Sequence, residues 1–200
     1  MLKVENKSQE EIAEIGRRIG EAFAAEKEGI VTMLTEEQTI KAFEIMTESF
    51  YRAGTLYTTS ERGEGYVAYW EKKSRPVAIA PALHMIKRFL DELPLTACIA
   101  VAQSGGEQYA KIFRKEPDYI VVSMVVVLRE FQGKGFMHKV LEQPFAEAVQ
   151  KNIPCVLDTD TPLKVKKYIR CGMELCGEKK LKHGISLYTL AYRKNTKKDR

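Results

Sequence analysis

Residues 119–141, which read YIVVSMVVVLREFQGKGFMHKVL, hold the pattern that decides the fold. Tyr119 to Leu128 is a continuous apolar run rich in β-branched residues, typical of a strand buried on both faces. A turn containing Gly133 and Gly135 follows, and apolar residues at helical spacing come after it. The first N–H groups of a helix lack backbone partners, and glycine lets an anion approach them closely. The stretch therefore predicts a strand, a turn suited to phosphate groups and a helix.

Known nucleotide-binding motifs do not explain this turn. The sequence lacks the P-loop pattern G-x-x-x-x-G-K-[ST], and Gly133-Lys134-Gly135 lacks the third glycine of a dinucleotide fingerprint. Lys134 adds a positive charge to the turn. On these residues alone, a phosphate site and a purely structural connection are equally supported.

Upstream, two helix starts carry capping-box patterns, Ser8 with Glu11 and Thr35 with Gln38. The other upstream signals are two β-prone runs joined by a glycine-containing turn, a third helical pattern and a polar turn. We expect helices at 8–26, 35–52 and 80–93, a hairpin from 55–60 and 66–70, and a loop at 103–107.

The composition is that of a folded globular chain. Of 200 residues, 44% are hydrophobic and 30% are charged, which excludes disorder as the main state. The longest apolar run is far shorter than the roughly 20 residues of a membrane span. The polar N-terminus shows no signal peptide, so we expect a cytoplasmic protein.

The net charge of +5 is modest, but eight basic residues form two local clusters that favour anionic ligands. The clusters are Lys164, Lys166, Lys167 and Arg170, and Arg193, Lys194, Lys197 and Lys198. Four cysteines without an export signal do not indicate a disulfide framework. Cys171 and Cys176 lack the usual zinc-ligand spacing, so we expect no metal site and four thiols in or near the core.

Four segments, in order, resemble the GNAT superfamily of N-acetyltransferases, and most closely the bacterial relatives of puromycin N-acetyltransferase. QGKGFM at 132–137 resembles the coenzyme A loop, written Q/R-x-x-G-x-G/A. LDT at 157–159 resembles a strand end that reads L-E-T. VKKYIRCGM at 165–173 resembles a helix and turn that carry a tyrosine followed by glycine, and GISLYTLAYR at 184–193 resembles the last strand.

The resemblance implies an α/β (α+β) fold with a mixed, twisted central sheet that splays at its centre and is flanked by helices. It implies one domain over 1–200: N-terminal helices, a hairpin and a helical insertion in 1–118, the coenzyme A-binding and catalytic core in 119–193, and a tail in 194–200. The splay separates strand 119–128 from strand 154–158. The implied acetyl-CoA-binding residues are Val125, Val127, Gln132, Gly133, Lys134, Gly135, Phe136, Met137, His138 and Lys164.

The sequence departs from the family pattern at three positions. Met137 stands where the family has a small residue, and Asp158 replaces a glutamate. Lys164 stands in place of an asparagine that helps hold coenzyme A, and a cation near phosphates is a plausible substitute.

By the same resemblance, Tyr168 is the general acid that protonates the departing thiolate. A backbone N–H at Val125 or a neighbour would hold the thioester oxygen. The general base stays open, with Glu130, Asp158, Asp160, His138 and a water relay as alternatives.

Three functions stay open. The first is an acetyl-CoA-dependent N-acetyltransferase acting on a small-molecule amine, the second a coenzyme A-binding sensor or subunit without catalysis, and the third a basic nucleic-acid-binding protein. No nucleic-acid motif is present, so we expect no nucleic-acid partner. Because the apolar runs are too short for a membrane span, we also expect no membrane partner. The sequence leaves open the acceptor amine and whether the chain forms a homodimer. One aromatic group is a candidate for either the acceptor pocket or the core: Phe50, Tyr51, Tyr57, Tyr66, Tyr69 and Trp70.

Overall fold

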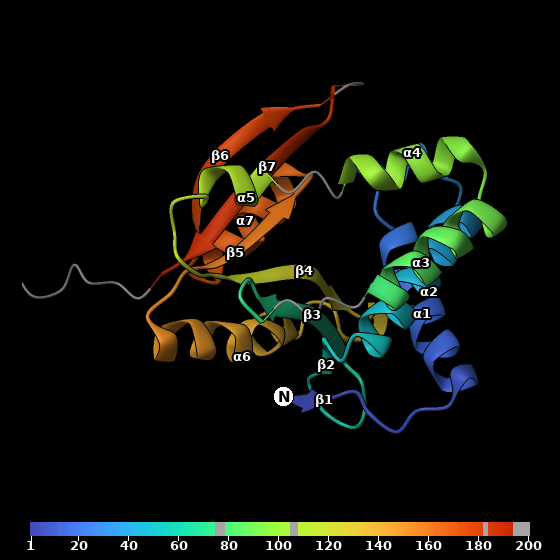
Figure 1. The fold of residues 1–200 in the computed structure, drawn as a ribbon, viewed down its shortest axis with the longest axis horizontal. Coiled ribbons are helices and arrows are strands. Elements are labelled where there is room, and N and C mark those ends of the chain that lie inside the picture. Colours follow the sequence, from blue (N-terminus) through green and yellow to red (C-terminus); the bar gives the residue numbers. More distant parts are fainter. Residues whose placement is uncertain (75–78, 105–107, 182–183, 194–200) are drawn as a thin grey trace, which may run out of the picture.

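The computed structural model describes residues 1–74, 79–104, 108–181 and 184–193. These residues form a seven-stranded sheet in the order β1-β2-β3-β4-β5-β7-β6 (Figure 1). Neighbouring strands are antiparallel except β4 and β5, which are parallel. The expected mixed sheet is therefore confirmed. Its strands are β1 Leu2–Lys3, β2 Leu56–Thr58, β3 Gly65–Glu71, β4 Ile120–Val127, β5 Cys155–Thr159, β6 Glu174–Lys180 and β7 Ser186–Tyr192.

The helices expected from the capping patterns are confirmed. The Ser8 hydroxyl accepts the Glu11 N–H at 3.1 Å, and the Thr35 hydroxyl accepts the Gln38 N–H at 3.2 Å. Both caps satisfy N–H groups that the helix itself leaves unpaired. The helices are α1 Gln9–Ala24, α2 Glu36–Arg52, α3 Ile79–Glu92, α4 Leu95–Ser104, α5 Gln108–Ile112, α6 Phe136–Lys151 and α7 Pro162–Arg170, with short 3-10 helices η1 Ile30–Met33 and η2 Arg129–Phe131.

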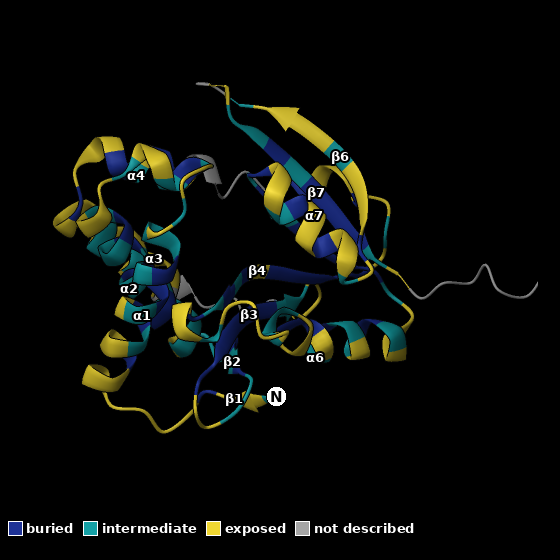
Figure 2. Cartoon of the chain, turned by 180° about the vertical axis from the view of Figure 1, so that it is seen from behind, coloured by how far each residue is buried: buried dark blue, intermediate teal, exposed yellow. Residues whose placement is uncertain are grey.

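Helices cover both faces of the sheet. Apolar residues of α6 and α7 pack against one face, as Val140 and Val165 do in a core shared with Leu157. On the other face, α1 packs against β3 and β4, and α5 packs against β4, β5 and β7. Figure 2 shows β4 mostly buried, as the sequence predicts for the central strand, whereas β6 at the sheet edge is mostly exposed.

A β-bulge in β4 changes which side chains face α6. Met124 lies opposite Ala68 and Val122 opposite Tyr69, so Ser123 is an extra residue without a partner on β3. Side chains alternate between the faces of a strand, and one extra residue inverts that alternation. Even-numbered residues face α6 before the bulge, and odd-numbered residues such as Val125 and Val127 do so after it.

The parallel strands β4 and β5 are paired only at their beginnings. The register joins Ile120 to Cys155 and Val121 to Val156, and the strands then diverge. Figure 1 shows the two halves of the sheet separating from this point. The splay predicted from the resemblance is therefore present.

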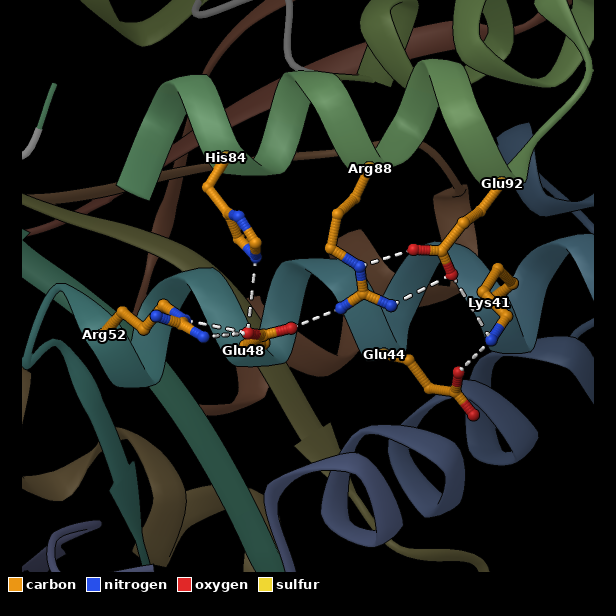
Figure 3. A network of polar contacts seen from close by, with 7 residues as sticks. All are labelled: Lys41, Glu44, Glu48, Arg52, His84, Arg88 and Glu92. Atoms are coloured by element: carbon orange, nitrogen blue, oxygen red, sulfur yellow. Dashed lines mark hydrogen bonds and ion pairs between the residues drawn. The ribbon is translucent and has the colours of Figure 1, made fainter. Parts of the chain in front are cut away.

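Charged side chains hold α3 on α2 (Figure 3). The Glu48 carboxylate, with 10% of its side chain exposed, is paired with Arg88 and with Arg52. Arg88 also pairs with Glu92 on its own helix. Because this polar face of α3 contacts α2, large apolar residues on the helix face solvent. The exposed ones on α3 and α4 are Leu83, Ile86, Leu90, Leu95 and Ile99.

Two sequence expectations need correction. Helix α4 continues through Ser104, so the loop expected at 103–107 begins later than predicted, and 105–107 lie outside the described residues. All four cysteines are free thiols, but Cys176 is exposed because it lies on the edge strand β6. His183 and the basic tail 194–200 also lie outside the described residues. Among the helices that the structure describes, none is long and apolar enough to cross a membrane.

Candidate active site

A cavity of about 540 Å³ opens where β4 and β5 diverge. Its sides are β4, the turn before α6, the end of β5 and helix α7, and its far wall comes from α1, η1, α2 and α4. The fold therefore brings the predicted site residues together from segments far apart in the sequence. All of them line the cavity except Lys134, whose ammonium lies 5.8 Å from the ring centroid of Phe131.

The edge of β4 faces the cavity with unpaired backbone groups. The Leu128 N–H donates to the Glu64 carbonyl at 2.9 Å. Hydrogen-bonded and non-hydrogen-bonded pairs alternate along an antiparallel ladder, so Val125 and Val127 direct their N–H and C=O groups away from β3. Strand β5 does not pair with them. The Gln132 amide occupies one of these groups by donating to the Val127 carbonyl at 3.0 Å.

The turn before α6 needs its glycines for their backbone conformation. Gly133 has φ of 75° and Gly135, the N-cap of α6, has φ of 80°, both in the left-handed region. A Cβ at either position would meet no atom within 4 Å. The first turn of α6 carries no acidic residue. The helix N-terminus is therefore open and free of nearby α6 carboxylates, as a bound pyrophosphate requires.

Tyr168 lies on α7, with 7% of the residue exposed, and lines the same cavity. Burial raises the pKa of its phenol, and the nearby groups of Glu26, Asp160 and Cys171 raise it further. A phenol is protonated at neutral pH at its ordinary pKa of about 10, and the raised pKa keeps the proton in place while making the hydroxyl a weaker acid.

Glu26, just beyond the end of α1, is a carboxylate in the cavity that the sequence analysis missed. It pairs with the Lys164 ammonium at 2.7 Å, and Lys164 pairs in turn with Asp160 at 2.8 Å. Burial raises the pKa of Glu26 above its usual value, although Lys164 opposes this shift. A carboxylate with a raised pKa is a better proton acceptor near neutral pH.

Two of the other carboxylates in the cavity are held by the scaffold. Asp160 accepts the Ile30 N–H at 2.7 Å, which ties η1 to the end of β5. A Cβ at Gly29 would lie 2.3 Å from the Asp160 carboxylate, so the tie requires glycine there. Asp158 accepts the Thr189 hydroxyl at 2.5 Å.

Comparison with known proteins supports the fold. No family model matches the sequence, and no curated protein sequence matches it. Among solved structures, arylalkylamine N-acetyltransferase 2 from Aedes aegypti is similar over 94% of this chain and 97% of its own, with 13% identity and a TM-score of 0.61. A polyamine N-acetyltransferase from Drosophila melanogaster is similar over 96% and 98%, with 13% identity and a TM-score of 0.60. The chain has the GNAT fold.

The GNAT fold alone does not fix the reaction. The C-terminal condensation domain of Ebony, solved with beta-alanyl-dopamine, is also similar, over 97% of this chain and 100% of its own, with 10% identity and a TM-score of 0.62. The reaction therefore depends on the site that this chain builds on the GNAT fold.

Within the GNAT fold, the structure separates the candidates for the general base. His138, Asp158 and Asp160 line the cavity. Glu130 is not among the lining residues, and it pairs with Arg18. No sequence motif distinguishes Glu26 from the neighbouring acidic residues, because its place in the cavity depends on where α1 ends relative to α7.

The aromatic group considered for the acceptor pocket packs into the core instead. Tyr66 and Tyr69 are buried, and none of the six residues lines the cavity. Phe23 and Phe43 line it and stack with ring centroids 3.9 Å apart. Among the residues that the structure describes, no group of histidine, cysteine and acidic side chains forms a metal site.

Proposed function

We propose that the protein is an N-acetyltransferase that transfers an acetyl group from acetyl-CoA to a primary amine of a small molecule. One observation carries the proposal: a single cavity joins an open helix N-terminus and an unpaired strand edge to a buried tyrosine and a carboxylate with a raised pKa. The structural similarity to N-acetyltransferases from two insects supports it.

The chain's own groups suit acetyl-CoA, which supplies an activated acetyl thioester. The backbone N–H groups of 133–138 would hold the pyrophosphate, with Lys134 adding positive charge. The exposed backbone of Val125 and Val127 would pair with the pantetheine arm, and an N–H there would hold the thioester oxygen. Contact between Lys164 and the cofactor stays a prediction, because this ammonium lies between Glu26 and Asp160.

The two titratable groups divide the proton transfers. Glu26 accepts a proton from the ammonium form of the acceptor, which frees the nitrogen lone pair. The new C–N bond forms as the C–S bond breaks, and Tyr168 donates its proton to the departing sulfur. The second proton lost by the amine nitrogen returns Tyr168 to its starting state through solvent. Glu26 releases the first proton to solvent, so one proton is released per turnover.

The experiment is an assay of thiol release from acetyl-CoA with a panel of primary amines. Amine-dependent release by the wild type supports the proposal. Glu26→Gln should lower kcat/KM by about 10²-fold or more, the usual size of a general base effect. Glu28→Gln is the matched control, because Glu28 is an exposed carboxylate two residues away. Equal rates in the two variants would remove Glu26 from the mechanism.

A second function, coenzyme A binding without catalysis, is favoured by Met137, which lines the cavity where the GNAT pattern has a small residue. Thermal stabilisation by acetyl-CoA without thiol release would identify it. The finer resemblance to relatives of puromycin N-acetyltransferase and the cytoplasmic location stay predictions.

A further inference from the structure

We infer that the acceptor is an amine with a single positive charge and an apolar body, rather than a polyamine or another polycation. The inference rests on the proposed function, because it takes the far wall of the cavity as the acceptor site. It follows from how charge is distributed over the cavity lining.

Among the residues that the structure describes, those of the far wall carry uncharged side chains only. Its residues from α1, η1, α2 and α4 are apolar, and most are half-buried because they face the cavity. The side chains of this wall are Ala22, Phe23, Ile30, Val31, Leu34, Ala42, Phe43, Met46 and Val101. An acceptor that extends past Glu26 therefore meets an apolar surface, which favours an aliphatic or aromatic group.

Within the part of the cavity lining that the structure describes, no carboxylate is left for a second positive charge. Glu26 lies at the border between the far wall and α7, where a reacting amine would sit. Asp160 shares Lys164 with Glu26 but also accepts the Ile30 N–H, and Asp158 accepts the Thr189 hydroxyl, so the scaffold already occupies both carboxylates. A second ammonium on the acceptor would lie against the apolar wall without a counter-ion, which is strongly unfavourable.

The direct test compares n-hexylamine with 1,6-diaminohexane, which has the same chain and one more amino group. Wild-type protein should acetylate n-hexylamine with a kcat/KM about 100-fold higher, because the second ammonium loses its hydration at the wall. Calorimetric titration of each amine into the protein with coenzyme A gives a readout that does not need turnover, and the same preference should appear. Equal or better binding and turnover of the diamine would overturn the inference.

A substitution at the wall tests its location. Met46→Glu places a carboxylate on the wall with an unbranched side chain of similar size, so diamine kcat/KM should rise by about 10-fold relative to n-hexylamine. Met46→Gln is the matched control, because it adds polarity without charge and should not favour the diamine. An unchanged ratio in a folded Met46→Glu protein would contradict the placement of the acceptor's far end.

The failure of this inference differs from the failure of the proposed function. If both amines are acetylated equally well, the proposed function stands and the selectivity is wrong. If neither amine releases thiol but n-hexylamine alone binds, the selectivity stands and catalysis is wrong.

Discussion

Replacing Gly135 by alanine should strongly weaken acetyl-CoA binding at a small cost in stability. Gly135 has φ of 80°, and a Cβ there would project into open space at the N-terminus of α6. Alanine in the left-handed region costs about 1–2 kcal/mol, which lowers Tm by roughly 2–8 °C in a chain of this size. The protein should remain folded, with a methyl group where the pyrophosphate is proposed to lie.

Gly184→Ala is the matched control. Gly184 has φ of 76°, its Cβ would also meet nothing within 4 Å, and it does not line the cavity. The two variants should therefore lose similar stability in the absence of ligand. Any difference in Tm between the two variants in the presence of acetyl-CoA therefore reports on binding in the cavity.

The assay is thermal unfolding with and without acetyl-CoA. At 100 times Kd, a ligand that binds only the native state stabilises it by about 2.7 kcal/mol. If the methyl group weakens binding 100-fold, the same concentration stabilises Gly135→Ala by only about 0.4 kcal/mol. Gly184→Ala should keep the full increase in Tm. An equal increase in both variants would refute the assignment of this turn to the pyrophosphate.

Three further predictions concern single side chains. Tyr168→Phe should keep acetyl-CoA affinity and lower turnover by ~10²-fold, whereas full activity in a stable variant would leave solvent as the proton donor. Lys164→Met removes the charge that opposes the raised pKa of Glu26, so the acidic limb of the kcat/KM profile should move to higher pH. Unchanged acetyl-CoA affinity in this variant would argue against a contact between Lys164 and a phosphate. Glu48→Gln should lower Tm by about 2–8 °C at neutral pH. Although burial raises the pKa of Glu48, Arg52 and Arg88 lower it overall, so the stabilisation from this carboxylate should disappear as the pH falls through the folded pKa. A constant difference in Tm between wild type and Glu48→Gln across acidic pH would contradict this.

The central strand, the glycine turn and the capped helices could be predicted because each depends on local patterns. A β-branched run, glycines before an apolar helix, and Ser8 with Glu11 specify their own geometry. The splay and the clustering of 125–138 with Tyr168 came from family resemblance, since no periodicity reports how two distant strands diverge.

Other features depend on tertiary contacts that one sequence does not reveal. The spacing of Leu83, Ile86 and Leu90 predicts helix α3 correctly, but the charge network around Glu48 turns these residues toward solvent. Glu26 acquires its raised pKa from burial beside α7, and the residues around it in the sequence indicate neither the burial nor the raised pKa. The bulge at Ser123 likewise follows from pairing with β3.

A crystal structure of the protein with coenzyme A would show directly where the cofactor lies. We predict the pyrophosphate on the backbone N–H groups of 133–138, the pantetheine arm along Val125 and Val127 between β4 and β5, and the sulfur next to the Tyr168 hydroxyl. Coenzyme A bound outside this cavity, or a sulfur far from both Tyr168 and Glu26, would contradict this prediction.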